Sequence, residues 1–213
     1  MSAHRGVAVR AHFDRFPASL KGALVLRGED PDPHQVVLRE ARVVQLGGGP
    51  SRPLVLPGSV VDLPPRRDVF VPFEFPLADL EPGWYALECD LEVDGHPGTL
   101  ECGQRFPIAW PRVTVRRGVL PVARSLDVGR ARVRIDQVEC LADRARVRFA
   151  VEGEEAPPIR VLADGARLPV VEGDFDPERG QGVLTTYPVL RTHASLRIEV
   201  GRGRDVARLE LPL

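Results

Sequence analysis

Carboxylate side chains gather in two short Gly- and Pro-rich segments that could bind a hard cation through oxygen. The first segment holds Asp30, Asp32 and His34, and the second, residues 174–178, holds three carboxylates beside Arg179. Neither segment has the full ligand series of a calcium loop, and no Cys-x-x-Cys or His-Glu-x-x-His spacing for zinc occurs in the chain. We therefore expect solvated loops here, with no metal site and no cofactor.

Motifs for catalysis are also missing from the sequence. There is no Gly-x-Ser-x-Gly nucleophile elbow, and no motif places a base beside any serine. The run Gly47–Gly49 lies between expected strands rather than before a helix, so it lacks the amide dipole that holds phosphate. His96 has a carboxylate close by, Asp94, and we interpret it as a turn residue. We expect no catalytic residues, and an enzyme is the least favoured class.

Arginine provides the most distinctive candidate binding surface. Lys21 is the only lysine among 29 basic residues and the chain has no Asn, a bias typical of GC-rich coding in a bacterium. Arg132 and Arg134 alternate with apolar residues in one segment, and Arg146 and Arg148 do so in a second. If these segments pair as a hairpin, the guanidinium groups share the face opposite the core. Such a face could bind an anion, an acidic protein or nucleic acid, or it could simply be solvated.

The two tryptophans are the other candidates for binding. Trp84 has the opposite parity to Tyr85 on an expected strand, so we predict that it is exposed, as a contact anchor or a sugar platform would be. Trp110 lies among prolines near the expected domain boundary and could instead wedge between the domains. A cleft lined by either ring would favour a small-ligand or carbohydrate-binding module.

Strands must position all of these side chains. The 20 glycines and 21 prolines interrupt the sequence at short intervals, which leaves no window for a helical stripe. Apolar residues alternate with polar ones between these breaks, most clearly in 84–93, and this period of two is typical of a strand with one buried face. Asp94-Gly95 and Asp164-Gly165 then predict tight hairpin turns. The fold class is all-β and antiparallel.

The chain length suits two modules, because 213 residues is about twice a common domain size. We predict two tandem β-sandwich domains, 1–117 and 118–213, with the boundary after a strand at 113–115. The formal net charge of −1 gives no reason to seek nucleic acid or an anionic membrane. The N-terminus lacks the apolar region of a secretory signal, so a cytoplasmic location is expected. The three cysteines predict buried free thiols.

A family resemblance supports the predicted fold. Leu80, Pro82, Gly83 and Tyr85 resemble the tyrosine corner of immunoglobulin-like and fibronectin type III-like sandwiches, in which the tyrosine hydroxyl bonds back to the corner backbone. The first half is also similar to an arrestin-type sandwich in its Phe- and Pro-rich run 70–76. These resemblances imply two immunoglobulin-like β-sandwiches and leave the function open.

The function expected from this reading is a non-catalytic protein-interaction or scaffold protein. A rigid sandwich displays variable loops and open strand edges, so another protein is the expected partner. A small-ligand or carbohydrate-binding module is the alternative, and a homodimer through edge strands stays open. Neither a membrane nor nucleic acid is expected as a partner.

Overall fold

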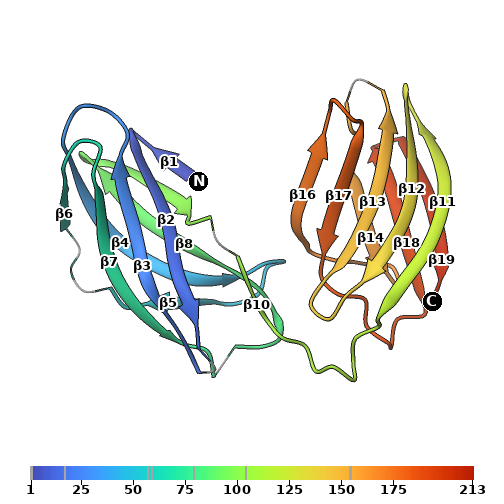
Figure 1. Cartoon of the computed structure of the whole chain (residues 1–213), viewed down its shortest axis with the longest axis horizontal. Coiled ribbons are helices and arrows are strands. Elements are labelled where there is room, and N and C mark those ends of the chain that lie inside the picture. Colours follow the sequence, from blue (N-terminus) through green and yellow to red (C-terminus); the bar gives the residue numbers. More distant parts are fainter. Residues whose placement is uncertain are drawn as a thin grey trace. The chain divides into compact units, whose positions relative to one another are not determined.

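The computed structural model describes residues 2–16, 18–56, 58, 60–78, 80–103, 105–153 and 155–213 (Figure 1). Every regular element in these ranges is a β-strand, as predicted. The chain divides into two compact units, Met1–Ile108 (unit 1) and Ala109–Leu213 (unit 2). In the described part of the chain, no helix is long and apolar enough to cross a membrane.

Unit 1 is a sandwich of two antiparallel sheets (Figure 1). The first sheet has the order β1-β2-β3-β7 and contains β1 (Ser2–His4), β2 (Val7–Arg15), β3 (Ser19–Gly28) and β7 (Asp68–Pro76). The second has the order β10-β8-β4-β5, with β6 also paired to β4 and β9 to β8; its strands are β4 (His34–Gln45), β5 (Ser51–Leu54), β6 (Val60–Leu63), β8 (Gly83–Val93), β9 (His96–Glu101) and β10 (Phe106–Ile108). In immunoglobulin lettering the sheets read A-B-E (β2, β3, β7) and C′-C-F-G (β5, β4, β8, β9).

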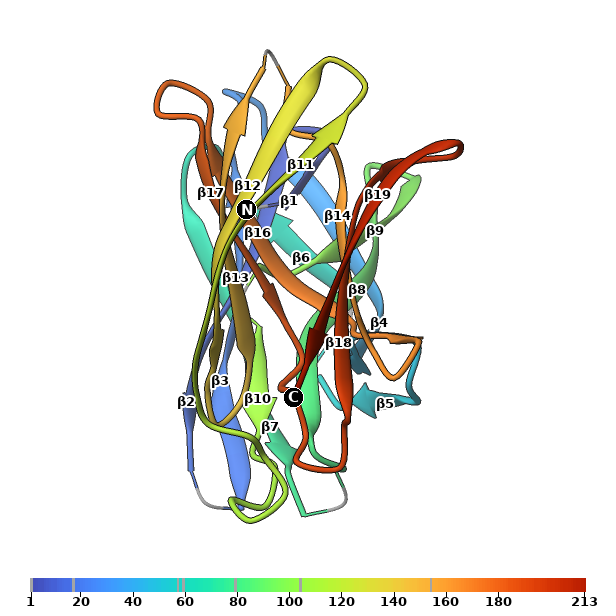
Figure 2. The same ribbon diagram turned by 90° about the vertical axis from the view of Figure 1, so that its right-hand side faces the viewer.

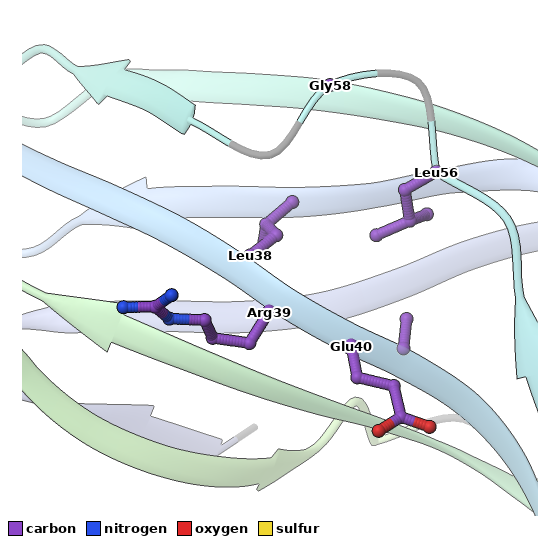
Figure 3. Close-up of a pocket in the computed structure, with 6 residues that line it drawn as sticks. Leu38, Arg39, Glu40, Leu56 and Gly58 are labelled. Atoms are coloured by element: carbon purple, nitrogen blue, oxygen red, sulfur yellow. The ribbon is translucent and has the colours of Figure 1, made fainter.

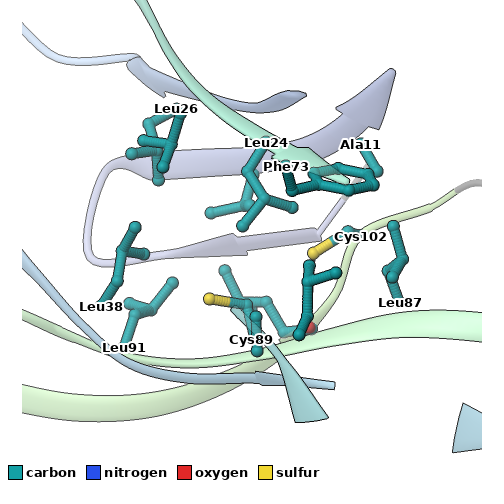
Figure 4. Packing of buried hydrophobic residues seen from close by; sticks show 14 of the residues in the cluster. Ala11, Leu24, Leu26, Leu38, Phe73, Leu87, Cys89, Leu91 and Cys102 are labelled. Atoms are coloured by element: carbon teal, nitrogen blue, oxygen red, sulfur yellow. Dashed lines mark hydrogen bonds between the residues drawn. The ribbon is translucent and has the colours of Figure 1, made fainter. Parts of the chain in front are cut away.

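The core of unit 1 lies between these two sheets (Figure 4). Successive side chains of a strand point to opposite faces, so every second residue of β8 enters the core. Leu87, Cys89 and Leu91 are each at most 1% exposed. Figure 4 shows them opposite Leu24 and Leu26 of β3. The strand alternation seen in the sequence is therefore an alternation of burial.

Unit 2 is a second antiparallel sandwich, and Figure 2 shows its two sheets nearly edge-on. One sheet has the order β11-β12-β13-β17-β16, with β11 (Gly118–Val128), β12 (Ala131–Cys140), β13 (Ala145–Glu152), β16 (Val170–Asp176) and β17 (Gln181–Thr186). The other has the order β15-β14-β18-β19, with β14 (Ile159–Ala163), β15 (Ala166–Arg167), β18 (Ser195–Arg202) and β19 (Asp205–Pro212). Leaving β11 aside as an extra edge strand, the order is A-B-E-D and C′-C-F-G, the immunoglobulin arrangement.

The core of unit 2 contains a close approach at a glycine. Phe149 of β13 and Phe175 of β16 stack with their ring centroids 6.2 Å apart and an angle of 4° between their planes. Gly182 of β17 lies opposite both residues in the register, and a Cβ atom there would lie 2.4 Å from the Phe149 ring. The missing side chain at Gly182 therefore gives the two rings room to meet across the intervening strand.

The boundary between the units lies before the predicted one. The segment 113–115 was expected to end the first domain, but Val115 forms a bridge to Leu190, and Arg116 N–H donates to the Val189 carbonyl at 2.9 Å. The residues just before β11 are therefore held by unit 2. The pairing partner lies about 75 residues away, so no local pattern could have revealed it.

The predicted tight turns are present. Asp94 and Gly95 have φ angles of 48° and 82° and join β8 to β9, and Asp164 and Gly165 join β14 to β15 in the same way. Positive φ at both central residues is the requirement of a type I′ turn, which Asp-Gly meets at little cost. At the start of β8, the Tyr85 hydroxyl donates to the Glu81 carbonyl at 2.9 Å.

Candidate functional site

One end of unit 1 brings together loops that are distant in the sequence. β4 begins at His34, directly after the loop 29–33, and pairs with β8, which ends in the Asp94-Gly95 turn. Asp94 is fixed there by two bonds to Gln35: its own N–H donates to the Gln35 carbonyl at 3.0 Å, and its Oδ1 accepts from the Gln35 N–H at 2.9 Å. The turn is thus fastened to the first residues of β4.

His34 is held between two carboxylates at this end. Its Nε2 lies 2.5 Å from Asp30 Oδ1, and its Nδ1 lies 2.7 Å from Asp94 Oδ2. The side chain is only 9% exposed. Hydrogen bonds to Asp94 and Asp30 raise the pKa of His34 above its ordinary value of 6.5, and the bond from His34 lowers the pKa of Asp94. Both ring nitrogens face acceptors, so the imidazolium is the form that fits this site.

A cavity of about 550 Å³ opens beside His34. Its walls are mainly proline and leucine, and its polar groups are His34, Gln35 and two carboxylates; the lining residues are Pro33, His34, Gln35, Asp62, Leu63, Pro64, Pro65 and Asp94. Proline walls keep their shape because the ring fixes φ. We call this cavity the His34 pocket.

Asp62 is the carboxylate that the His34 pocket leaves available. It is exposed on β6, opposite Gln35 in the register. No ion pair or hydrogen bond holds its side chain among the residues that the structure describes. A free carboxylate above apolar walls suits a side chain with an aliphatic stem and a cationic end, which is the make-up of Arg and Lys.

The sequence had singled out part of this site. Asp30, Asp32 and His34 were predicted to form a solvated loop, and Asp94 was predicted to form a turn with His96. The structure brings Asp30 and His34 to Asp94, 60 residues further along the chain from His34, while His96 accepts through its backbone oxygen from the His4 side chain. The sequence does not reveal this site, because Asp94 reaches His34 only through the pairing of β4 with β8 in the folded chain.

A second cavity, of about 310 Å³, lies beside the middle of β4 (Figure 3). β6 pairs with residues 34–37 and β5 with residues 41–44, so neither strand covers the stretch between them, where β4 bulges. Figure 3 shows Leu38 and Leu56 on the loop side of β4, while Arg39 and Glu40 extend the other way. Arg39 pairs with Glu92 at 2.5 Å, and the lining of this cavity is as much polar as apolar.

The four candidate arginines of unit 2 lie on the pair of strands that the sequence predicted. β12 and β13 do form a hairpin, but a bulge after Ile135 shifts the register. The bulge places Gln137 opposite Arg148 and Glu139 opposite Arg146; before it, Arg132 faces Glu152 and Arg134 faces Ala150, so no arginine of this hairpin lies directly opposite another. Like charges directly opposite one another destabilise a sheet, and this register avoids them.

Acidic neighbours also neutralise three of these four arginines. Arg148 pairs with Glu139 at 2.5 Å, and this bond lowers the pKa of Glu139. Arg134 pairs with Asp136 at 2.7 Å, and Arg132 lies 3.6 Å from Asp127. Three of the four candidate arginines therefore belong to an ion-paired surface.

The tryptophans do not form an exposed platform. Trp84 was predicted to be exposed, but it is only 5% exposed, because β10 extends the sheet at that point and places Pro107 beside it. Trp110 is half-buried and packs edge-on against Tyr187 of the same unit, with ring centroids 5.2 Å apart. The four cavities described for the two units have neither tryptophan in their lining.

Some of the remaining candidate groups are engaged within the chain. In the loop 174–178, Asp176 Oδ1 accepts from the backbone N–H groups of Glu178 and Arg179 at 3.0 and 3.2 Å. Within the described ranges, no group of three or more His, Cys, Asp or Glu side chains could hold a metal ion. Burial raises the pKa of Cys89 and of Cys102 to about 12, which keeps both thiols protonated.

Comparisons with known proteins give a limited result. No protein-family model and no curated protein matches the chain. Among solved structures, a conserved domain protein from Bacillus anthracis is similar over 100% of this chain and 87% of its own, with 10% identity and a TM-score of 0.33. The titin Ig tandem domains A164-A165 are similar over 97% of this chain and 94% of their own, with 11% identity and a TM-score of 0.26. At these scores the fold rests on the strand order itself.

Proposed function

We propose that this chain is a non-catalytic protein-interaction protein, and that its His34 pocket receives a basic side chain of a partner protein. The observation that carries this proposal is the free Asp62 carboxylate at the rim of a proline-walled cavity. Charge complementarity selects the occupant: a guanidinium or ammonium group meets Asp62, and its aliphatic stem lies along Leu63, Pro64 and Pro65.

The state of the reactive side chains supports a non-catalytic role. His34 already shares both ring nitrogens with carboxylates, and the Cys89 and Cys102 thiols are buried and protonated. A nucleophile needs a base within hydrogen-bond reach and access to substrate, and these groups lack one or the other. A cytoplasmic location is part of the proposal and agrees with free cysteines.

The proposal is tested by isothermal titration calorimetry with a blocked pentapeptide, acetyl-Ala-Leu-Arg-Leu-Ala-amide. The comparison peptide carries citrulline, which keeps the shape of arginine without its charge. We expect the full chain to bind the arginine peptide more tightly. Asp62→Asn should weaken that binding about two- to fivefold, the range of an exposed ion pair.

Asp14→Asn is the matched control, because Asp14 is another exposed aspartate of unit 1, on β2. It should leave the affinity unchanged. Equal binding of the arginine and citrulline peptides would contradict the proposal, and so would an equal loss of affinity in the two variants.

A further inference from the structure

We propose that His34 is a protonation-controlled latch: its imidazolium ties the loop 29–33 to the Asp94-Gly95 turn, and loss of the proton releases that loop. As a regulator of partner binding, the latch rests on the function proposed above. As a property of unit 1, it can be measured without any partner.

The latch needs two N–H donors on one ring. Asp30 Oδ1 lies 2.5 Å from Nε2 and Asp94 Oδ2 lies 2.7 Å from Nδ1, so each ring nitrogen must carry a proton to donate. Neutral imidazole has a single N–H, and its other nitrogen would present a lone pair to a carboxylate. Deprotonation therefore removes one of the two bonds and replaces it with a repulsive contact.

The bond between His34 and Asp30 is the one that deprotonation breaks. Asp94 has two further anchors, since its Oδ1 accepts from the Gln35 N–H and its own N–H donates to the Gln35 carbonyl. The hydrogen-bond partner of the Asp30 carboxylate is His34. Neutral His34 accordingly keeps its proton on Nδ1, toward Asp94, and turns a bare Nε2 toward Asp30.

Other charged groups lie on the elements next to the latch, among them Arg5 in the turn between β1 and β2, whose Gly6 lies against Asp30. Asp62 on β6 lines the same cavity as His34, and Glu29 and Asp32 flank Asp30 in its loop. Arg66 and Arg67 are exposed after Pro65, and His96 follows the turn that holds Asp94. His34 itself is 9% exposed, and the carboxylates that bond to it are the groups that set its protonation.

Release of the loop would reshape the His34 pocket. Pro33 is the last residue of the loop and forms one wall of the cavity, next to His34 itself. The start of the loop stays fastened, because the Glu29 N–H donates to the Gly6 carbonyl at 2.8 Å. The loop would thus loosen between Asp30 and Pro33, and the pocket would be complete only while His34 is protonated.

NMR spectroscopy of the full chain tests the latch. Ring ¹⁵N shifts of His34 are followed from about pH 6 to about pH 9, together with the ¹H–¹⁵N heteronuclear NOE of the Asp30 and Asp32 amides. We expect His34 to lose its proton above 6.5, its ordinary pKa, and to retain the Nδ1–H tautomer. The heteronuclear NOE of the loop amides should decrease with the same midpoint. In His34→Gln, the NOE should no longer depend on pH.

Two further variants keep the test decisive. Asp30→Asn removes the negative charge next to Nε2 of the His34 ring, so the midpoint of the His34 titration should move to lower pH. His12→Gln changes an exposed histidine on β2 and should leave the midpoint in place. The latch is refuted if His34 titrates at or below its ordinary value, or if the loop NOE follows pH equally in His34→Gln. A failed peptide titration alongside a confirmed midpoint would instead refute the proposed function alone.

Discussion

At the scale of single residues, the chain keeps its reactive groups occupied. His34 lies between Asp30 and Asp94, and the Tyr85 hydroxyl is bonded to the Glu81 carbonyl at the corner before β8. Arg42 shows the same tendency on the outer face of β4, where Asp90 at 2.5 Å raises its pKa. Loss of each contact is expected to lower the free energy of unfolding by a different amount.

The Tyr85 hydroxyl is expected to stabilise unit 1 measurably. Tyr85→Phe keeps the ring, which stacks on Phe106 with centroids 5.8 Å apart, but leaves the Glu81 carbonyl without this donor. Because the residue is only 2% exposed, we expect a loss of about 1 kcal/mol in the free energy of unfolding. Urea denaturation followed by the fluorescence of Trp84 measures it. An unchanged transition midpoint would show that the corner bond contributes nothing.

His34 and Asp94 predict a maximum of unit 1 stability in mildly acidic solution. The pKa of His34 is raised, so its contribution is complete below 6.5 and is lost as the pH rises through the raised value. The pKa of Asp94 is lowered, so its contribution is complete above 3.8 and is lost as the pH falls through the lowered value. The urea concentration at the unfolding midpoint should be highest between these two values and should decrease at both lower and higher pH. His34→Gln should abolish the fall on the alkaline side; if that fall persists, another group causes it.

At the scale of strands and sheets, much of the architecture could be predicted from local pattern. Alternation located β8, β12 and β13, and Asp-Gly marked two of the tight turns, because both signals act within a few residues. The positions of Gln137 and Glu139 opposite Arg148 and Arg146 could not be predicted, because a single bulge after Ile135 moves every later residue of β12 by one position. The site at His34 could not be predicted for a related reason: the β4–β8 pairing that brings Asp94 to His34 is a long-range contact.

The stacked rings in unit 2 make a prediction about two neighbouring glycines. Gly182→Ala would place a Cβ atom 2.4 Å from the Phe149 ring, so we expect a loss of about 1–3 kcal/mol in the free energy of unfolding. Gly173→Ala is the matched control on the adjacent strand, where the nearest atom would be Leu184 Cδ1 at 3.7 Å. Its stability should be unchanged or slightly raised. The fluorescence of Trp110 reports both transitions, and equal losses in the two variants would contradict this packing.

The ion-paired register of β12 and β13 predicts weak interaction with polyanions. Replacing Arg132, Arg134, Arg146 and Arg148 together with Ser removes the charges that the sequence first suggested as a binding face. Because Glu139, Asp136 and Asp127 already pair with three of them, we expect the wild-type chain and this variant to elute from heparin at nearly the same salt concentration. Markedly stronger retention of the wild type would restore the binding face.

At the scale of the whole molecule, two immunoglobulin-like sandwiches display loops on rigid frames. Both units pair charged side chains across their sheets, and unit 1 in addition gathers loops from three parts of the chain around the His34 pocket. Loops on a rigid scaffold are where binding residues of sandwich proteins concentrate. We therefore propose that a partner is recognised at one end of unit 1 rather than on the sheet faces.

The most direct test of that assignment is to map where the arginine pentapeptide changes the amide ¹H–¹⁵N spectrum of the full chain. We expect the shifted amides to cluster at Gln35, Asp62, Leu63 and Asp94, and this cluster to disappear in Asp62→Asn. Shifts centred on β12 and β13 or around Trp110, with the amides of the His34 pocket unmoved, would contradict it.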